Sequence, residues 1–235
     1  MVAQDIDLAL PQGVRHALIG PNGAGKTTLI NLITGMLEPD AGQIVLDGED
    51  ITGFKPEARV RRGLARTFQI NTLFPQLSAL ESVALAVLER EGHAHTWWRG
   101  LSRFGTEVDE AASILQSLNL QKNFHRLTRE LAYGEQRLLE IALALATRPR
   151  VLLLDEPAAG VPKDESAELF AAIASLSSEL TVLFIEHDMD VVFRFASRIL
   201  VMVGGRILAQ GTPDEIAHDA RVREVYLGNA GRAAA

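Results

Sequence analysis

The residues with the clearest chemistry form one glycine-rich segment, Gly20-Pro-Asn-Gly-Ala-Gly-Lys-Thr-Thr28. It fits the pattern G-x-x-x-x-G-K-(S/T), whose backbone N–H groups surround a phosphate. The glycines permit the positive φ angles that turn these groups inward, and Lys26 adds a positive charge for the β- and γ-phosphates. The Thr27 hydroxyl suits Mg²⁺, which prefers oxygen ligands. The sequence therefore predicts a nucleoside-triphosphate site formed by Gly20, Pro21, Asn22, Gly23, Ala24, Gly25, Lys26, Thr27 and Thr28.

Two adjacent carboxylates, Asp155 and Glu156, follow an apolar run over 151–154. Ligands of α/β sheets bind at the carboxyl ends of the strands, so a buried strand here delivers both acids to that edge. We expect Asp155 to hold the hydration shell of Mg²⁺ and Glu156 to orient or deprotonate an attacking water. Two solvated acids at a strand end are the alternative, and the phosphate loop upstream in the same sheet argues against it.

These residues need strands and helices to position them, and the apolar patterns predict both. Strands are expected at 2–12, 17–19, 43–46, 49–51, 64–68, 151–154, 181–185, 199–203 and 206–209. Helices are expected at 27–37, 78–91, 106–118, 134–147 and 164–176, and from Thr212 onward. Asp47-Gly48 and Gly204-Gly205 predict hairpins, and Ser78 with Glu81 has the spacing of a capping box.

The pattern changes within the chain. From 76 to 148 we expect helices without strands, whereas both ends mix strands and helices. The hairpins require antiparallel pairs, and the apolar runs at 151–154 and 181–185 are typical of buried parallel strands. The prediction is an α/β fold with a P-loop core over 1–75 and 149–235, a mixed parallel and antiparallel sheet, and an inserted all-helical subdomain over 76–148.

Composition excludes several classes of function. The chain has 235 residues, no cysteine and a formal net charge of −7, so disulfides and thiolate metal sites are ruled out and a sequence-independent nucleic-acid binder is disfavoured. No apolar run approaches the roughly 20 residues that span a bilayer, and no signal peptide follows Met1. We expect a soluble chain that meets a membrane only through a partner.

A third motif, Leu131-Ala-Tyr-Gly-Glu-Gln-Arg137, opens the helix expected at 134–147. With 20–28, Gln69, Asp155-Glu156 and His187, it resembles the nucleotide-binding subunits of ABC transporters in order and spacing over nearly the whole chain. The resemblance implies an ATPase that uses ATP and Mg²⁺ and sandwiches two ATP molecules in a head-to-tail dimer.

The resemblance also implies a role for each matching residue. The helix start at Tyr133, Gly134, Glu135 and Gln136 faces the γ-phosphate bound by the second subunit. Gln69 contacts Mg²⁺ and the attacking water, and His187 stabilises the γ-phosphate. The implied metal residues are Thr27, Gln69 and Asp155, and the implied catalytic residues are Glu156, His187 and Gln69.

A narrower similarity comes from 63–69, 155–160 and 185–189. These segments resemble the ATP-binding subunits of high-affinity branched-chain amino-acid uptake systems, and are similar to related urea/amide and lipopolysaccharide-export ATPases. The resemblance implies two membrane permeases, a second ATP-binding subunit, an indirect solute-binding protein and a peripheral place on the cytoplasmic face of the inner (plasma) membrane. The solute, the direction of transport and the identity of the two ATPase subunits, like or unlike, stay open.

Three departures from the family pattern bear on activity. Ala132 stands where the family usually has Ser, which removes a hydrogen bond worth about 0.5–1.5 kcal/mol. Val161-Pro-Lys163 replaces the usual acid or Asn before Pro. The family normally begins with a further strand and an aromatic residue that stacks on adenine, whereas no aromatic residue precedes Phe54 in this chain. Either adenine is held less tightly or by another contact, or Met1 is an internal start.

A binding module that senses ATP while a partner hydrolyses it is therefore the alternative function. A non-transport kinase or GTPase is disfavoured by the motif at 131–137 and by the absence of Asn-Lys-x-Asp.

Two further clusters receive an ordinary interpretation. His93-Ala-His95 with Trp97-Trp98 is expected to be a partner-facing or partly buried loop rather than a metal site, because no third ligand has useful spacing. The basic run is expected to be a solvated face, with contact to acidic lipid or a permease loop as the lesser option; it comprises Arg59, Arg61, Arg62 and Arg66.

Overall fold

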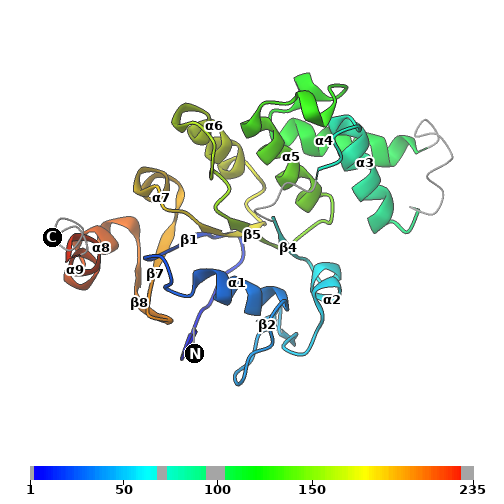
Figure 1. Cartoon of the computed structure of the whole chain (residues 1–235). Coiled ribbons are helices and arrows are strands. Elements are labelled where there is room, and N and C mark those ends of the chain that lie inside the picture. Colours follow the sequence, from blue (N-terminus) through cyan, green and yellow to red (C-terminus); the bar gives the residue numbers. More distant parts are fainter. Residues whose placement is uncertain (1–2, 68–72, 94–103, 229–235) are drawn as a thin grey trace.

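A twisted sheet forms the centre of the computed structural model, which describes residues 3–67, 73–93 and 104–228 (Figure 1). These residues form a six-stranded sheet in the order β4-β5-β6-β1-β7-β8. Five neighbouring strands are parallel and β8 runs antiparallel to β7, so the predicted mixed sheet is confirmed. The bounds are β1 Arg15–Ile19, β4 Leu64–Arg66, β5 Val151–Asp155, β6 Thr181–Ile185, β7 Arg198–Val203 and β8 Arg206–Gly211.

Helices cover both faces of this sheet (Figure 1). Side chains alternate between faces along a strand, so Leu18 and Leu153 pack with α1 (Lys26–Thr34) on one side. Leu152 and Leu154 pack on the other side with α6 (Lys163–Ala174) and α7 (Met189–Phe195). Burial on both faces explains why β5 and β6 are continuous apolar runs.

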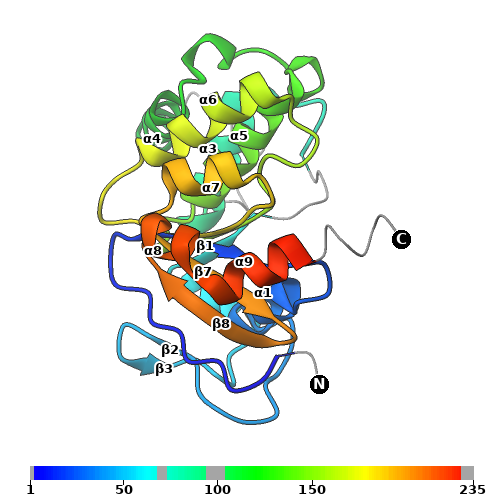
Figure 2. The ribbon, with the colours of Figure 1, turned by 90° about the vertical axis from the view of Figure 1, so that its left-hand side faces the viewer.

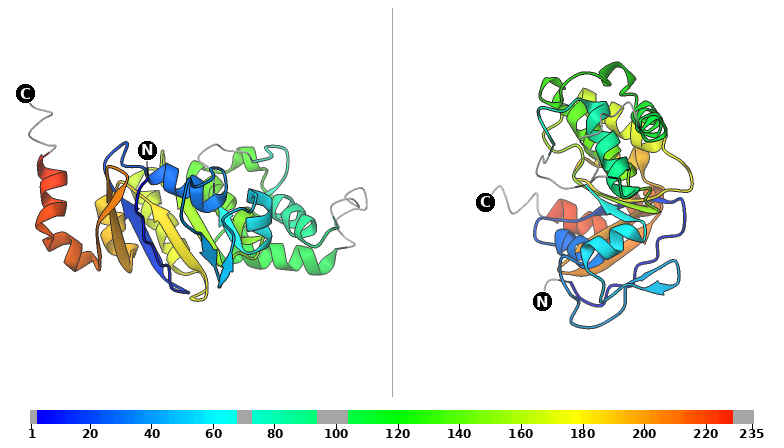
Figure 3. Two further views of the ribbon diagram at one scale, coloured as in Figure 1. Left: turned by 90° about the horizontal axis from the view of Figure 1, so that it is seen from below. Right: turned by 90° about the vertical axis from the view of Figure 1, so that its right-hand side faces the viewer.

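In the described part of the chain between β4 and β5, helices are joined by turns and loops, and one isolated antiparallel bridge pairs Ser78 with Leu127. This part of the chain contains α3 (Ala79–Arg90), α4 (Gly105–Ser117), α5 (Tyr133–Leu145) and the 3₁₀ turns Gln121–Asn123 and Thr128–Glu130. α3 begins with the predicted capping box, in which Glu81 N–H donates to Ser78 Oγ and Ser78 N–H donates to Glu81. Seen from below, these helices lie at one end of the molecule, and α8 (Pro213–His218) and α9 (Ala220–Gly228) lie at the other (Figure 3).

Both predicted hairpins are confirmed. β2 (Val45–Leu46) pairs with β3 (Glu49–Asp50) through Asp47 and Gly48, whose φ angles of 50° and 82° are the left-handed values of a tight hairpin turn. β7 and β8 meet at Gly204-Gly205. The small hairpin lies on the side of the sheet away from α6 and α7 (Figure 2).

Two predicted elements are wrong in part. No strand forms between residues 3 and 12, although Ile6, Leu8 and Leu10 pack against the α1 core in the predicted alternation. A strand needs a ladder of backbone hydrogen bonds to a neighbouring strand. The Gln4 N–H donates to the Gly205 carbonyl oxygen in the turn between β7 and β8, and this one bond does not make a ladder. The helix expected to reach 37 ends at Thr34, because Gly35 adopts φ 77° and closes it.

The basic run is not a solvated face at two of its positions. Arg59, on α2 (Pro56–Arg61), is 1% exposed and donates hydrogen bonds to four carbonyl oxygens, those of Leu32, Ile33, Thr52 and Phe54. It ties the end of α1 to the chain after β3. None of the helices in the described ranges is long and apolar enough to cross a membrane.

Candidate active site

The glycine-rich loop connects β1 to α1, as its pattern requires. A Cβ added at Gly20 would lie 2.1 Å from the Met202 carbonyl oxygen, so only glycine fits beside β7. Gly25 precedes α1 with φ 101° and lets the loop turn into the helix. No side chain caps the start of α1, so the first N–H groups of this helix are not bonded to a capping side chain and lie at the end of the loop.

Lys26 is the buried cation of this loop. It is 7% exposed, and its Nζ donates to the carbonyl oxygens of Gly20 at 2.7 Å and Pro21 at 3.1 Å. Burial lowers the pKa of Lys26, and the carboxylates of Glu156 and Asp155 act against that shift. The ammonium is thus held by the loop carbonyls, and its charge is favoured by the two predicted acids.

Asp155 ends β5 and is already paired. Its Oδ2 accepts a hydrogen bond from Arg66 Nη2 at 2.7 Å; the Asp155 side chain is 2% exposed and that of Arg66 is 11% exposed. Arg66 Nη1 donates to Asn31 Oδ1 at 2.6 Å, so the guanidinium joins β4, β5 and α1. The prediction that Arg66 belongs to a solvated face is wrong. Arg66 is the last residue of β4 and is paired with Leu153 on β5, two residues before Asp155, so its side chain lies on the same face of the sheet as Asp155.

Glu156 and His187 meet although 31 residues separate them. Glu156 Oε1 lies 2.7 Å from His187 Nε2, because β5 and β6 are neighbouring parallel strands that end at the same edge. Glu156 has a φ of 50°, a left-handed value that strains a non-glycine residue. The sequence predicted both residues, but not their direct contact.

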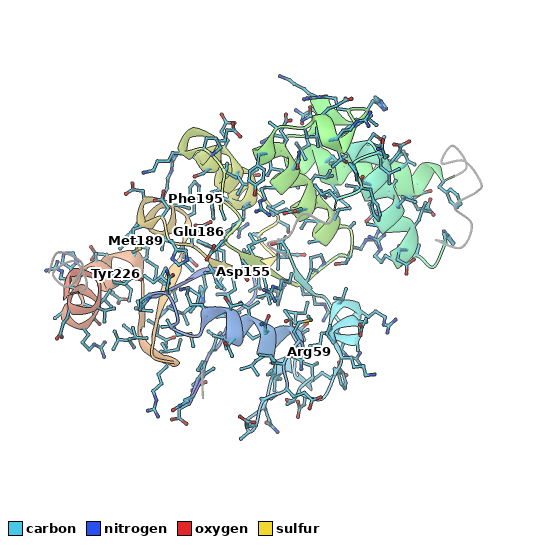
Figure 4. The ribbon with its side chains drawn as sticks, viewed as in Figure 1. Arg59, Asp155, Glu186, Met189, Phe195 and Tyr226 are labelled. Carbon is cyan, nitrogen blue, oxygen red and sulfur yellow. The ribbon has the colours of Figure 1, made fainter. Side chains whose placement is uncertain are left out.

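Glu186 is a buried carboxylate that the sequence analysis did not single out. It accepts hydrogen bonds from the N–H groups of Ala158 at 3.0 Å and His187 at 3.2 Å. Burial raises the pKa of Glu186. Its signal was an acid directly after the apolar run 181–185, the same pattern as Asp155 after 151–154. Figure 4 labels Asp155 and Glu186 near the middle of the molecule. With Glu156 and His187, Glu186 lines an open pocket of about 280 Å³.

The start of α5 uses a different construction. Ala132 precedes the helix and has no side chain that could accept a hydrogen bond. Glu135 turns back instead: its Oε2 accepts the Ala132 N–H at 2.8 Å and its Oε1 accepts from Asn123 Nδ2 at 2.7 Å. Tyr133 is 39% exposed, and its hydroxyl accepts a hydrogen bond from Arg137.

This helix start contacts the chain that follows β5. A Cβ added at Gly134 would lie 2.8 Å from Glu165 Oε2, and one added at Gly160 would touch the Tyr133 ring. Gln136 Nε2 donates to the Leu131 carbonyl oxygen. The motif at 131–137 is therefore packed beside the segment that leaves Glu156.

Part of the predicted set lies outside the described residues. This applies to Gln69, His95, Trp97 and Trp98. His93 is described, and its Nδ1 lies 3.1 Å from Glu107 Oε1 on α4.

Comparison with known proteins agrees with this arrangement. The family model described as "ABC transporter" matches residues 3–159, two thirds of the chain. The chain belongs to the ABC transporter ATP-binding family. A second model, described as "Branched-chain amino acid ATP-binding cassette transporter", matches residues 206–231 of this ABC subunit. As a member of the ABC transporter ATP-binding family, the chain is an ATPase.

Similar proteins cover nearly the whole of the ABC subunit. It is 43% identical over 240 residues to the high-affinity branched-chain amino acid transport ATP-binding protein BraF of Pseudomonas aeruginosa, covering 98% of this chain and 93% of BraF. It is 39% identical to LivG of Escherichia coli, with the same coverage. The solved ADP conformation of MJ1267, an ATP-binding cassette of an ABC transporter, aligns with a TM-score of 0.84 at 31% identity, covering 97% and 92% of the two chains.

The residues of this ABC subunit fit a nucleotide with Mg²⁺. The loop has no room for a side chain at Gly20, Lys26 supplies a buried cation, and Thr27 and Asp155 supply oxygen donors. Within the described ranges no cluster of three or more His, Cys, Asp or Glu residues could hold a metal. Mg²⁺ does not need one, since it commonly keeps several waters and takes one or two protein ligands beside phosphate oxygens.

Proposed function

We propose that this ABC subunit hydrolyses ATP to drive the import of branched-chain or related amino acids through membrane permeases. The contact between Glu156 and His187 carries the catalytic part of the proposal, because it brings a carboxylate and an imidazole together at the strand ends beside the phosphate loop. The relatives named for branched-chain amino acid transport support the solute class, as does the family match at 206–231.

The loop would hold the phosphates. Backbone N–H groups of 20–28 and the Lys26 ammonium bind their oxygens, and Lys26 exchanges its two loop carbonyls for them. Thr27 and Asp155, with Gln69, would hold Mg²⁺, which neutralises phosphate charge when bound. This assignment follows from oxygen chemistry and from the family resemblance of those three residues.

Glu156 is proposed as the residue that takes a proton from the attacking water. Its partner His187 lies 2.7 Å from the carboxylate, and the family resemblance supports a second role for His187 in binding the γ-phosphate. Glu186 accepts hydrogen bonds from the backbone N–H groups of Ala158, two residues after Glu156, and of His187, so it stabilises the backbone near both members of this pair. Strain at Glu156 is consistent with an active-site residue held by its surroundings.

A second ATP-binding subunit would complete each site. The α5 start at Tyr133, Gly134, Glu135 and Gln136 would face the γ-phosphate bound by the partner, using the backbone donors of a helix N-terminus. ATP then closes a head-to-tail dimer and hydrolysis reopens it. The dimer moves two permeases at the cytoplasmic face of the inner membrane, which receive solute from a binding protein.

The test of this proposal is the variant Glu156→Gln. It keeps the size of the side chain but removes the base, so ATP should bind without being hydrolysed and should trap a dimer. Size-exclusion chromatography with light scattering, with and without Mg-ATP, measures this. Glu179→Gln changes an exposed glutamate and is the matched control. A Glu156→Gln chain that stays monomeric with Mg-ATP at high protein concentration would contradict the sandwich model.

The observation at Ala132 favours a second candidate function. Without a hydroxyl at the start of α5, the chain could sense ATP while an unlike partner hydrolyses it. Turnover by the purified chain, compared with Lys26→Ala, separates the two: turnover no higher than that of the variant supports the sensing subunit. The solute is tested separately, by comparing stimulation of the assembled transporter by leucine, urea and lipopolysaccharide.

A further inference from the structure

Arg66 is a buried cation beside the site whose role the reaction does not yet explain. It is the last residue of β4, at the edge of the sheet, and its side chain is 11% exposed. A buried guanidinium is stable only when its donors are satisfied and its charge is compensated. Arg66 compensates its charge with Asp155 and uses both of its terminal nitrogens as donors inside the nucleotide site rather than at the surface.

The sheet register directs Arg66 toward Asp155. Arg66 is opposite Leu153 on β5, and Asp155 is two residues further along, so its side chain leaves the same face. This is the α1 face, since Leu153 packs with Leu29 and Ile30. The ion pair spans 2.7 Å, and the Asp155 side chain is 2% exposed.

The second bond of Arg66 leads to the same region. Its Nη1 donates to Asn31 Oδ1 at 2.6 Å, and Asn31 lies four residues after Thr27 on α1. Residues four apart share one face of a helix, so Asn31 lies one turn beyond Thr27 on the same side. The guanidinium therefore lies between Asp155 and the helix face that bears the predicted metal residue.

We propose that Arg66 is a positioning residue that holds Asp155 before nucleotide binds and thereby sets the Mg²⁺ concentration that the site requires. This inference rests on the proposed roles of Asp155 and Thr27 toward Mg²⁺. Arg66 supplies the positive charge that the carboxylate needs while the site is empty of cation. It keeps the carboxylate oriented toward α1 in that state.

The charges make the two partners of Asp155 competitors. A divalent cation near Thr27 would attract the same carboxylate that Arg66 binds, and it would repel the guanidinium in a region of low solvent exposure. The guanidinium and the cation therefore each weaken the interaction of the other with Asp155, and the coupling acts equally in both directions. Removing Arg66 should therefore raise the apparent affinity for Mg²⁺, whereas a purely structural arginine would leave that affinity unchanged.

The experiment measures Mg²⁺ binding through nucleotide binding, without turnover. Fluorescent ADP is held at a fixed concentration with the full chain, Mg²⁺ is titrated, and anisotropy reports the half-point. We expect Arg66→Gln to lower the Mg²⁺ half-point about five-fold or more. Affinity for the nucleotide without Mg²⁺ should stay within about two-fold of wild type, since Arg66 does not bind phosphate in this proposal.

Two further variants complete the test. Asn31→Ala removes one anchor of the guanidinium and should shift the half-point the same way by about two-fold, which keeps the test open if Arg66→Gln fails to fold. Arg221→Gln breaks an exposed pair with Asp219 and should change nothing. An unchanged half-point in Arg66→Gln and Asn31→Ala overturns the inference, and so does a large loss of Mg²⁺-free affinity in Arg66→Gln. A wild-type chain whose nucleotide affinity ignores Mg²⁺ contradicts the proposed function instead.

Discussion

Two regions that the sequence marked for phosphate are built in opposite ways. At the strand ends, side chains meet at close range: the Arg66 guanidinium with Asp155, and the His187 imidazole with the Glu156 carboxylate. The backbone there includes left-handed residues, Gly25 and Glu156. At the start of α5, Glu135 accepts the Ala132 N–H, and the exposed residues are Ala132 and Tyr133.

The difference indicates a division of labour. Strained backbone and compensated charges persist where the surrounding sheet holds them, which suits the place where bonds break. A relaxed helix N-terminus offers only N–H groups, which suits a surface that binds an anion from elsewhere. The predictions below challenge this contrast, beginning with the largest effect.

Lys26→Ala should have the largest effect, because it removes the only cation that the phosphate loop itself contributes. We expect ATP turnover to fall about 100-fold or more, with weaker ATP binding. Steady-state phosphate release and nucleotide anisotropy measure the two effects. Lys122→Ala, outside the site, is the control. ATP binding by Lys26→Ala within a few-fold of wild type would show that the phosphate loop does not hold the triphosphate.

Glu156→Gly tests the strain at the strand ends. Both Gly and Ala lose the carboxylate, but only Gly accepts φ 50° freely, so Glu156→Gly should be about 1 kcal/mol more stable than Glu156→Ala. Chemical denaturation measures the difference. The same pair at Glu168, inside α6, should give the opposite sign by about 1 kcal/mol. Equal stability of the two variants at 156 would mean that this backbone is not strained.

Ala132→Ser tests the backbone-only helix start. A hydroxyl there can accept an N–H of the first turn of α5, which should stabilise the chain by about 0.5–1 kcal/mol. If the α5 start also faces a partner's phosphate, turnover should rise about two- to ten-fold. Ala171→Ser, inside α6, should instead lose a few tenths of a kcal/mol, about what helix propensity predicts. Greater stability with unchanged turnover would separate this helix from catalysis.

Local signals in the sequence carried much of the fold. Asp47-Gly48 and Gly204-Gly205 predicted their hairpins because left-handed turns demand those residues, and Ser78 with Glu81 predicted the start of α3 because a capping box spans four residues. The strand expected at 2–12 failed because alternation reports burial, whereas a ladder requires a partner.

The site shows the same limit. Residue types and spacing predicted Lys26, Asp155 and Glu156, and the family resemblance added His187, but neither predicted which side chains would touch. The pairing of Glu156 with His187 depends on β5 and β6 being neighbours, and that of Arg66 with Asp155 depends on the register of β4. Which strands are neighbours, and in what register, is determined by the order of strands in the sheet, and the local sequence pattern does not specify that order. Arg59 was misjudged for the same reason, since its four carbonyl partners come from separate segments.

Glu186→Gln should give the smallest effect and tests whether charge burial at the strand ends is compensated. Burial raises the pKa of Glu186 above its ordinary value of 4.5. The folded chain therefore binds this proton more tightly than the unfolded chain, and the stability that this adds is complete below pH 4.5 and is lost as the pH rises through the raised pKa.

Because glutamine does not titrate, the stability of Glu186→Gln relative to wild type should increase over that same rise in pH and then level off. The gain should be no more than about 1 kcal/mol, since the N–H groups of Ala158 and His187 stabilise the ionised carboxylate. Glutamine loses one acceptor oxygen at every pH, so the pH-dependent part of the difference is the diagnostic one. Denaturation curves of both chains between pH 4 and pH 8 measure it, with Glu179→Gln as the exposed control. A difference that stays flat with pH would mean that the two backbone donors offset burial completely, and that the strand ends hold this third carboxylate without strain.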